Sequence, residues 1–344
     1  MKQIPKRLHI IWVGGDIPQK NRECIISHRQ KSQNWEVNLW IDRDQLLTGF
    51  RRSHVAAHYK AKNKVDKSGK VTAEKWQKMQ GAVADGGEDA TIAYMTKKFG
   101  MTERELRDRS WDNYISIRDF CKEHRIEFHL VSELDTAKNF QIYKNEMVAR
   151  GTNFGAASDI LRIEILYRHG GVYVDTDVKA MHDFGIIEAH KSHPRFSAVH
   201  PKWASKGSSV TPGQWVDDKW WEGIPNIPKI SNSIIASHAK CSGLKSYRKL
   251  ITDNYKGLKS SDSLRQEYES NIRTSTLRMT GPTAAEKSSG YAKLHEKRRV
   301  QSETLGQTNL DEGKAKVLET NLYMRDNWWF PMFLVSDQYF HDWL

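Results

Sequence analysis

Residues 157–177 constrain the fold of this chain more than any other stretch of the sequence. Apolar side chains recur there at the spacing of one helical face, at Ile160, Ile163, Leu166 and Tyr167. Gly170 and Gly171 then end the helix as C-cap glycines do. An apolar strand pattern over residues 172–178 follows directly. A helix that runs through a tight turn into a buried strand is typical of an α/β protein.

Two carboxylates stand at the carboxyl end of this predicted strand. Side chains alternate along a strand, which places Tyr173, Asp175 and Asp177 on one face. Neighbouring carboxylates repel each other unless a positive charge lies between them. The carboxyl edge of an α/β sheet is also where ligands bind. Mg²⁺ or Mn²⁺, which take carboxylate, water and phosphate oxygens, would fit, so we predict a metal site at Asp175 and Asp177.

Asp159 and Arg162 lie three residues apart on the preceding helix and therefore share one side of it. The guanidinium of Arg162 could hold a phosphate or a carboxylate. The alternative interpretation is an exposed acidic turn with an ion pair inside the helix. We favour a functional site, because Asp-x-Asp after a buried helix, an Asp-x-x-Arg and a double glycine is far more specific than Asp-x-Asp alone.

The beginning of the chain also predicts an α/β sheet. Residues 7–15 have the pattern of a buried strand that ends in a glycine turn. Residues 21–33 are helix-like, and residues 35–41 are a second strand candidate. Strand, helix and strand within this short span begin a βαβ unit. Further strands are expected around residues 127–131 and 230–236.

The length of 344 residues fits about two domains, or one large α/β domain with insertions. We predict one domain over residues 1–344, because the strand candidates are spread along the whole chain. The polar, lysine-rich residues 44–115 are predicted to be a helical insertion, and residues 241–300 a basic helical region. Residues 326–344 are predicted to be a C-terminal lid.

The charge and the cysteines exclude several classes of protein. The formal net charge is +12, with basic clusters in residues 51–80 and 293–299. These clusters are either solvated helical faces or a surface for an acidic partner, such as an anionic membrane. No nucleic-acid-binding motif accompanies them. Three widely spaced cysteines predict no disulfide framework. No transmembrane segment is present, and no secretory signal of the usual form is expected, because a strand candidate begins at Leu8.

Several blocks of the sequence resemble the DxD-type sugar-nucleotide glycosyltransferases of the GT-A fold. They include residues 4–15, with a tryptophan shortly before a Gly-Gly pair, and the stretch 157–177. This pattern is similar to the glycosyltransferase domains of large clostridial toxins and related bacterial effectors, with the Photorhabdus tyrosine-glycosylating toxin among the candidates. The resemblance implies a GT-A-like (Rossmann-like) α/β fold with a mixed, mainly parallel sheet and an appended helical subdomain.

The resemblance also implies roles for the residues of the motif. Trp12 would stack on the uracil, and Tyr173 would pack near the ribose. Asp159 would bind hydroxyls of the transferred sugar, and Arg162 the sugar or the diphosphate. Asp175 would contact ribose and sugar beside the metal. Asp177 would bind the metal directly.

Two further motifs match the family. Asn232, in the strand candidate over residues 230–235, matches an asparagine that approaches the sugar near the anomeric centre. The alternative is an asparagine at a strand edge that binds backbone. Thr280-Gly281-Pro282 resembles a helix start of the family and needs no role beyond a capping hydroxyl and a proline at the first helical position.

The tail offers two candidate lids. The first is Asp326-Asn327-Trp328, in which Asp326 and Asn327 would be metal ligands and Trp328 would contact the nucleotide. The second is Ser336-Asp337 followed by His341 and Trp343, in which the imidazole would bind Mn²⁺. Both tryptophan groups could instead be plain hydrophobic anchors.

The resemblance implies a metal-dependent transferase that uses Mn²⁺ or Mg²⁺. It would move glucose or N-acetylglucosamine from UDP-glucose or UDP-GlcNAc to a hydroxyl of a host protein, with retention. A Rho-type small GTPase is the expected acceptor. The expected location is the cytosol of the host cell, with membrane association possible through the Lys/Arg-rich helices. Two alternatives stay open, namely a capsule or lipopolysaccharide glycosyltransferase with a sugar acceptor, and a non-catalytic sugar-nucleotide-binding or membrane-docking module.

Overall fold

The computed structural model describes residues 1–61, 87–148, 153–199, 229–291, 310–338 and the single residues 293, 296 and 300. Its strands are β1 (Lys2–Gln3), β2 (Arg7–Trp12), β3 (Glu36–Ile41), β4 (Glu127–Leu130), β5 (Gly171–Val174), β6 (Val178–Ala180), β7 (Glu188–Ala189), β8 (Arg195–Val199), β9 (Lys229–Ser237) and β10 (Val335–Asp337). Its α-helices are α1 (Gln19–Lys31), α2 (Thr48–Ala61), α4 (Glu88–Phe99), α5 (Glu103–Glu123), α6 (Phe140–Val148), α7 (Phe154–His169), α8 (Ser242–Ser260), α9 (Asp262–Ser270), α10 (Ile272–Met279), α11 (Pro282–Ser289) and α13 (Leu310–Asn327).

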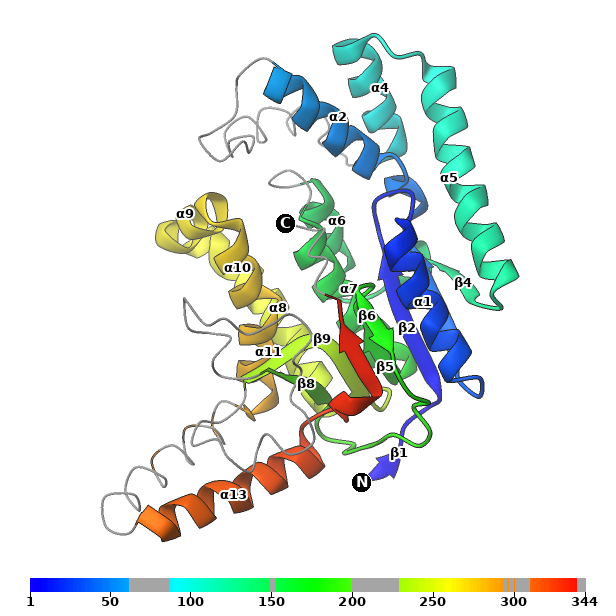
Figure 1. Cartoon of the computed structure of the whole chain (residues 1–344). Helices are drawn as coiled ribbons and strands as arrows, with labels where there is room; N and C mark the ends of the chain where they lie inside the picture. Colours follow the sequence, from blue (N-terminus) through cyan, green and yellow to red (C-terminus); the bar gives the residue numbers. More distant parts are fainter. Residues whose placement is uncertain are drawn as a thin grey trace.

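The central sheet has the strand order β4-β3-β2-β5-β9-β8 (Figure 1). Strands β4, β3, β2 and β5 are parallel, and β9 runs antiparallel to both of its neighbours. The first strand, helix and strand of the chain form β2, α1 and β3, as the sequence predicts. The fold is therefore the expected mixed, mainly parallel α/β fold.

The two faces of the sheet bury different side chains. Val172 and Val174 belong to one hydrophobic cluster with Leu8 and Ile10 of β2. Tyr173 belongs to the other cluster, together with the buried face of α7. The alternation predicted along β5 is confirmed, and α7 covers the second face.

The strand predicted over residues 172–178 is interrupted. Strand β5 ends at Val174, and a turn follows in which the amide of Val178 donates to the carbonyl of Asp175 at 3.1 Å. The chain resumes as β6, which pairs with β10 instead of continuing the main sheet. Asp177 therefore lies in a turn, and the strand alternation expected to carry it was wrong.

The described part of residues 44–115 is helical, and α2, α4 and α5 share a small core of their own that contains Val55, Ile92 and Met95. Residues 62–80 of the first basic cluster lie outside the described residues. Residues 242–289 form α8 to α11. All three cysteines are free, as predicted, and all three are buried. Among the described residues, no helix has an apolar stretch long enough to cross a membrane.

Candidate active site

The first part of the site is the loop after β2. Trp12 is half-buried at the carboxyl end of this strand, and its indole N–H donates to the carbonyl of Gly15 at 2.8 Å. Gly14 and Gly15 have φ angles of 133° and 116°, which side chains other than glycine rarely adopt. A Cβ at Gly14 would lie 2.8 Å from the ring of Phe154 at the start of α7. The double glycine therefore lets the loop that carries Trp12 pack directly on α7.

The second part is a buried cluster around Arg162. Its Nη2 lies 3.2 Å from Oδ1 of Asp159 and 3.1 Å from Oδ1 of Asp175. The guanidinium also donates to the backbone carbonyl of Asn232 at 2.6 Å. Arg162 is 4% exposed, and this burial by itself lowers its pKa, but the neighbouring charges of Asp175 and Asp159 outweigh it and raise the pKa above the usual value. One guanidinium thus ties α7 to β9 and to the turn after β5.

Tyr173 contacts both Arg162 and Asp175 in this cluster. Its ring is 1% exposed and lies 4.4 Å from the guanidinium carbon of Arg162. Its phenol donates to Oδ1 of Asp175 at 2.6 Å. Tyr173 therefore orients Arg162 and Asp175, and its packing near a ribose stays a prediction.

Asp159 is the most enclosed carboxylate of the site, at 6% exposed. Oδ1 accepts from the side-chain amide of Asn232 at 2.7 Å, and Oδ2 accepts from the hydroxyl of Thr280 at 2.9 Å. Burial raises the pKa of Asp159 to about 6, against the opposing effects of Arg162, Thr280 and Asn232. The structure thus brings Asp159, Arg162, Asn232 and Asp175 together.

Thr280 is a site residue that the sequence interpretation treated as architectural. Pro282 does begin α11 as predicted, but the N-cap is Gly281 and no side chain caps the helix, so the expected capping hydroxyl was wrong. However, Thr280 is fully buried and donates to a carboxylate 121 positions earlier in the chain. The signal that could have found it was the Thr-Gly-Pro motif itself.

Asp175 and Asp177 flank the turn after β5. The side chain of Asp175 is 29% exposed, and Asp177 is half-buried. Hard oxygen donors at the carboxyl edge of a sheet suit Mg²⁺ or Mn²⁺, which keep positions for water and phosphate. Among the described residues there is no group of three His, Cys, Asp or Glu side chains that could hold a metal alone. An ion held by Asp175 and Asp177 would therefore need further ligands, such as water or phosphate oxygens.

The described end of the tail reaches these aspartates. Strand β10 pairs with β6 in the register Asp337 to Val178, and the amide of Gln338 donates to the carbonyl of Asp177 at 2.8 Å. His341 and Trp343 lie outside the described residues. The second candidate lid thus begins beside Asp177.

The first candidate lid lies elsewhere. Trp328 is 8% exposed and stacks on His193 with ring centroids 4.1 Å apart. Asn327 is bound to His190 at 3.0 Å, and the carbonyl of Asp326 accepts from Arg195. Since Arg195 begins β8, which runs in the same direction as β5, this segment lies at the amino edge of the sheet. The structure does not bring Asp326, Asn327 and Trp328 to Asp177.

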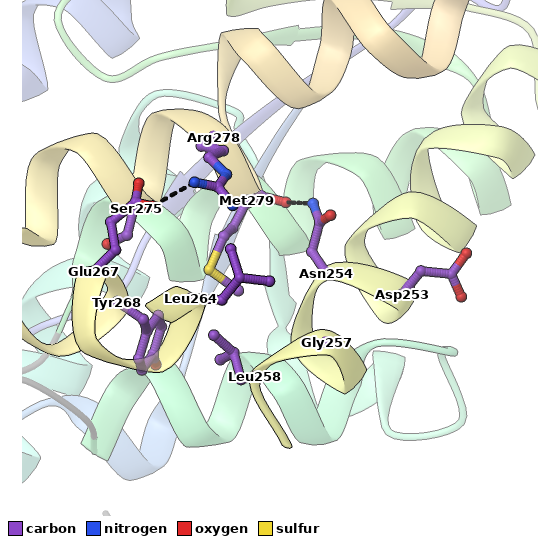
Figure 2. Close-up of a pocket in the computed structure, with 10 residues that line it drawn as sticks. All are labelled: Asp253, Asn254, Gly257, Leu258, Leu264, Glu267, Tyr268, Ser275, Arg278 and Met279. Atoms are coloured by element: carbon purple, nitrogen blue, oxygen red, sulfur yellow. Dashed lines mark hydrogen bonds and ion pairs between the residues drawn. The ribbon is translucent and has the colours of Figure 1, made fainter. Parts of the chain in front are cut away.

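A separate pocket of about 120 Å³ lies between α8, α9 and α10 (Figure 2). Figure 2 shows Leu258, Leu264 and Met279 pointing into it, with Asp253 and Arg278 at its rim. Arg278 is paired with Glu267, and Asn254 donates to the carbonyl of Met279 at 2.9 Å. The pocket shares no lining residue with the cluster around Asp159.

Comparison with known proteins decides the family. Residues 6–194 match the TcdA/TcdB catalytic glycosyltransferase domain. The chain belongs to this family. It is a toxin-type glycosyltransferase domain, and Asp159, Arg162, Asp175 and Asp177 lie within the matched range.

Curated relatives of this glycosyltransferase domain are much longer proteins. It is 20% identical over 176 residues to the Subversion of eukaryotic traffic protein A of Legionella pneumophila, and 25% identical over 197 residues to Toxin B of Clostridioides difficile. Each match covers 51% of the chain, but only 17% and 8% of those proteins.

Solved structures share its fold. The catalytic domain of alpha-toxin from Clostridium novyi has a TM-score of 0.64 at 13% identity, with 83% of this chain and 72% of that chain covered. A UDP-bound glycosyltransferase domain from the YGT toxin has a TM-score of 0.56 at 17% identity, with 86% and 78% covered.

Proposed function

We propose that this glycosyltransferase domain transfers glucose or N-acetylglucosamine from a UDP-sugar to a hydroxyl of a host protein, with retention at the anomeric carbon. The observation that carries the proposal is the buried Arg162, which joins Asp159 on one side to Asp175 on the other. A carboxylate enclosed in the site is suited to sugar hydroxyls, and one at the open edge is suited to a nucleotide and its cation.

Each side chain of the cluster has a proposed task. Asp159 and Asn232 bind hydroxyls of the sugar and hold the anomeric carbon in place. Arg162 places a fixed positive charge where negative charge grows on the departing diphosphate, which lowers the barrier. Asp175, held by the phenol of Tyr173, contacts ribose and sugar.

The Asp-x-Asp turn is the proposed cation site. Asp177 and Asp175 would hold Mn²⁺ or Mg²⁺, and the cation would stabilise the departing diphosphate as a Lewis acid. His341 is proposed as a further ligand and Trp343 as a cover over the nucleotide. The bond from Gln338 to Asp177 supports this, because it holds the last described residue of the tail next to the turn, three positions before His341.

Trp12 is the proposed platform for uracil. It is half-buried at the carboxyl end of β2, which is parallel to β5 and therefore ends at the same edge of the sheet as Asp175. The UDP-bound YGT toxin domain, which shares the fold, supports a uridine nucleotide as ligand.

The proposed acceptor is a Rho-type small GTPase, and the named toxins among the relatives support a host protein. The test is incubation of the protein with labelled UDP-glucose or UDP-GlcNAc, Mn²⁺ and a lysate of host cells. We expect label in a protein band of small-GTPase size. Label in lipid or polysaccharide alone would contradict the protein acceptor, and absence of both transfer and donor hydrolysis would contradict catalysis.

A further inference from the structure

The acceptor sites of the Asp159 carboxylate can be counted among the described residues. A carboxylate offers about four lone-pair sites, two on each oxygen. Oδ1 is approached by the amide of Asn232 at 2.7 Å and by Nη2 of Arg162 at 3.2 Å. Oδ2 is approached by the hydroxyl of Thr280 at 2.9 Å. One acceptor site on Oδ2 is therefore left over within the described part of the chain.

The position of the Thr280 hydroxyl is set by its backbone. The phenol of Tyr247 donates to the carbonyls of Thr280 at 2.5 Å and of Gly281 at 3.0 Å. Both Thr280 and Tyr247 are fully buried. The hydroxyl also lies 3.2 Å from the carbonyl of Thr276, but the carboxylate is the nearer and the charged acceptor.

Gly281 keeps a side chain away from Oδ2 of Asp159. A Cβ at this position would lie 3.3 Å from Oδ2 of Asp159. The φ angle of Gly281 is −89°, which any residue adopts, so backbone conformation does not require glycine here. The close approach to Asp159 and to the backbone of α10 accounts for it instead.

We propose that Thr280, anchored by Tyr247, is a positioning residue that fixes Asp159 with one acceptor site on Oδ2 open to a hydroxyl of the donor sugar. This inference rests on the proposed function, because it assigns the sugar part of a UDP-sugar to Asp159. It predicts that Thr280 affects the binding of the sugar and leaves the binding of UDP unchanged.

The test compares the affinities of UDP and UDP-glucose, or UDP-GlcNAc, by calorimetric titration with Mn²⁺. For Thr280→Val we expect the ratio of UDP-sugar affinity to UDP affinity to fall about tenfold, because a hydrogen bond to a charged group is lost. Thr280→Ser keeps the hydroxyl and should restore this ratio of affinities. Tyr247→Phe should lower the ratio of UDP-sugar affinity to UDP affinity about threefold, because the anchor of Thr280 and the hydrogen bond between Tyr247 and Asn232 are both lost. Thr252→Val is the matched control, since its hydroxyl donates to Asn139 at 2.8 Å, outside the cluster.

The outcomes separate this inference from the proposed function. If Thr280→Val has the same ratio of UDP-sugar affinity to UDP affinity as the unaltered protein, the positioning role alone is overturned. Equal loss of affinity for UDP and UDP-sugar, without rescue by Thr280→Ser, would also overturn it, because a structural defect would be the cause. If the unaltered protein binds neither nucleotide, the proposed function fails as well.

Discussion

Arg162 and Glu164 stand two residues apart on α7, and both are almost fully buried. Glu164 meets one cation: Arg248 donates to its Oε2 at 2.8 Å through Nε, and Asn139 donates to its Oε1 at 2.9 Å. Arg162 meets two carboxylates, Asp159 and Asp175. Each arginine also lies over a tyrosine ring, at 4.0 Å for Arg248 and 4.4 Å for Arg162.

The difference between these clusters is their charge balance and their access to solvent. The Glu164 pair is one to one and lies inside the contact between α7 and α8. The Arg162 cluster carries an excess of negative charge and opens to solvent at Asp175, which is 29% exposed. Burying charge is costly, so a closed pair serves the fold, whereas an unbalanced and accessible cluster indicates a ligand.

The largest effect is expected at the open end of the Arg162 cluster. The double substitution Asp175→Asn with Asp177→Asn should reduce transfer by at least about a thousandfold, because the cation and the diphosphate lose their charged contacts. Arg162 keeps Asp159 as a charged partner after the substitution, so the fold should be retained. Transfer at saturating UDP-sugar and Mn²⁺, together with a melting curve, checks this. Normal activity would remove both aspartates from the site.

Matched substitutions of the two arginines test the comparison directly. Arg162→Met should lower turnover about a hundredfold or more, because charge stabilisation of the leaving group is lost. Arg248→Met should lower the free energy of unfolding by about 3 kcal/mol, because Glu164 stays buried without its cation. Turnover per folded Arg248→Met molecule should be unchanged. Similar loss of activity in both variants would erase the distinction between the clusters.

Two tryptophans extend the comparison to the neighbouring strands. Trp12→Ala should weaken UDP binding by about 1–3 kcal/mol, the scale of base stacking on an aromatic side chain. Trp40, on β3, is 1% exposed and donates to His9 at 3.2 Å. Trp40→Ala should instead cost about 3–5 kcal/mol of stability. Calorimetry with UDP and denaturant titration of both variants measure the two effects, and an unchanged affinity in folded Trp12→Ala would refute stacking.

The smallest effect is a pH dependence that belongs to Asp159. Burial raises its pKa to about 6. Below this pH the carboxyl is neutral and is a weaker hydrogen-bond acceptor than the carboxylate. We therefore expect kcat/KM to fall about tenfold per pH unit below 6. The folded pKa exceeds the usual 3.8, so the folded state holds more protons between these values. The contribution of Asp159 to stability therefore grows as pH falls from 6 towards 3.8, and it is lost as pH rises through 6.

Two measurements check this pH dependence. Activity profiles between pH 5 and 8 for the unaltered protein and Asp159→Asn should differ, with no step near pH 6 in the variant. Melting curves over the same range should show that the activity falls without unfolding. A step that persists in Asp159→Asn would assign the titration to another group.

Local features of the fold could be predicted because they depend on neighbours in sequence. The helical spacing of apolar residues and the Gly170-Gly171 stop predict α7 and the start of β5 within a residue or two of their observed positions, whereas the predicted end of the strand at Val178 lies four residues beyond the observed end at Val174. The pairing of Asp159 with Arg162 is also local, since three positions on a helix bring side chains together. Asp175 also reaches the guanidinium of Arg162 through a local feature, namely the short turn between α7 and β5.

Long-range contacts could not be predicted in this way. The bond from Thr280 to Asp159 joins residues 121 positions apart, and the bond from Arg248 to Glu164 joins residues 84 apart. Neither leaves a periodic signal, because each depends on how α8 and α10 pack across α7. The break in the strand after Val174 also depends on a distant partner, β10.

The sequence by itself determined the order of strands and helices, the toxin-type DxD core and the local pair on α7, because spacing along a helix or strand decides which side chains share a face. Tertiary structure alone decided which charges became a closed pair and which an open cluster. It also placed Asp326, Asn327 and Trp328 at the amino edge and Gln338 beside Asp177. The physical reason is that the direction and pairing of β8, β6 and β10 decide which edge of the sheet each segment reaches, and that choice is made by packing between segments far apart in the chain.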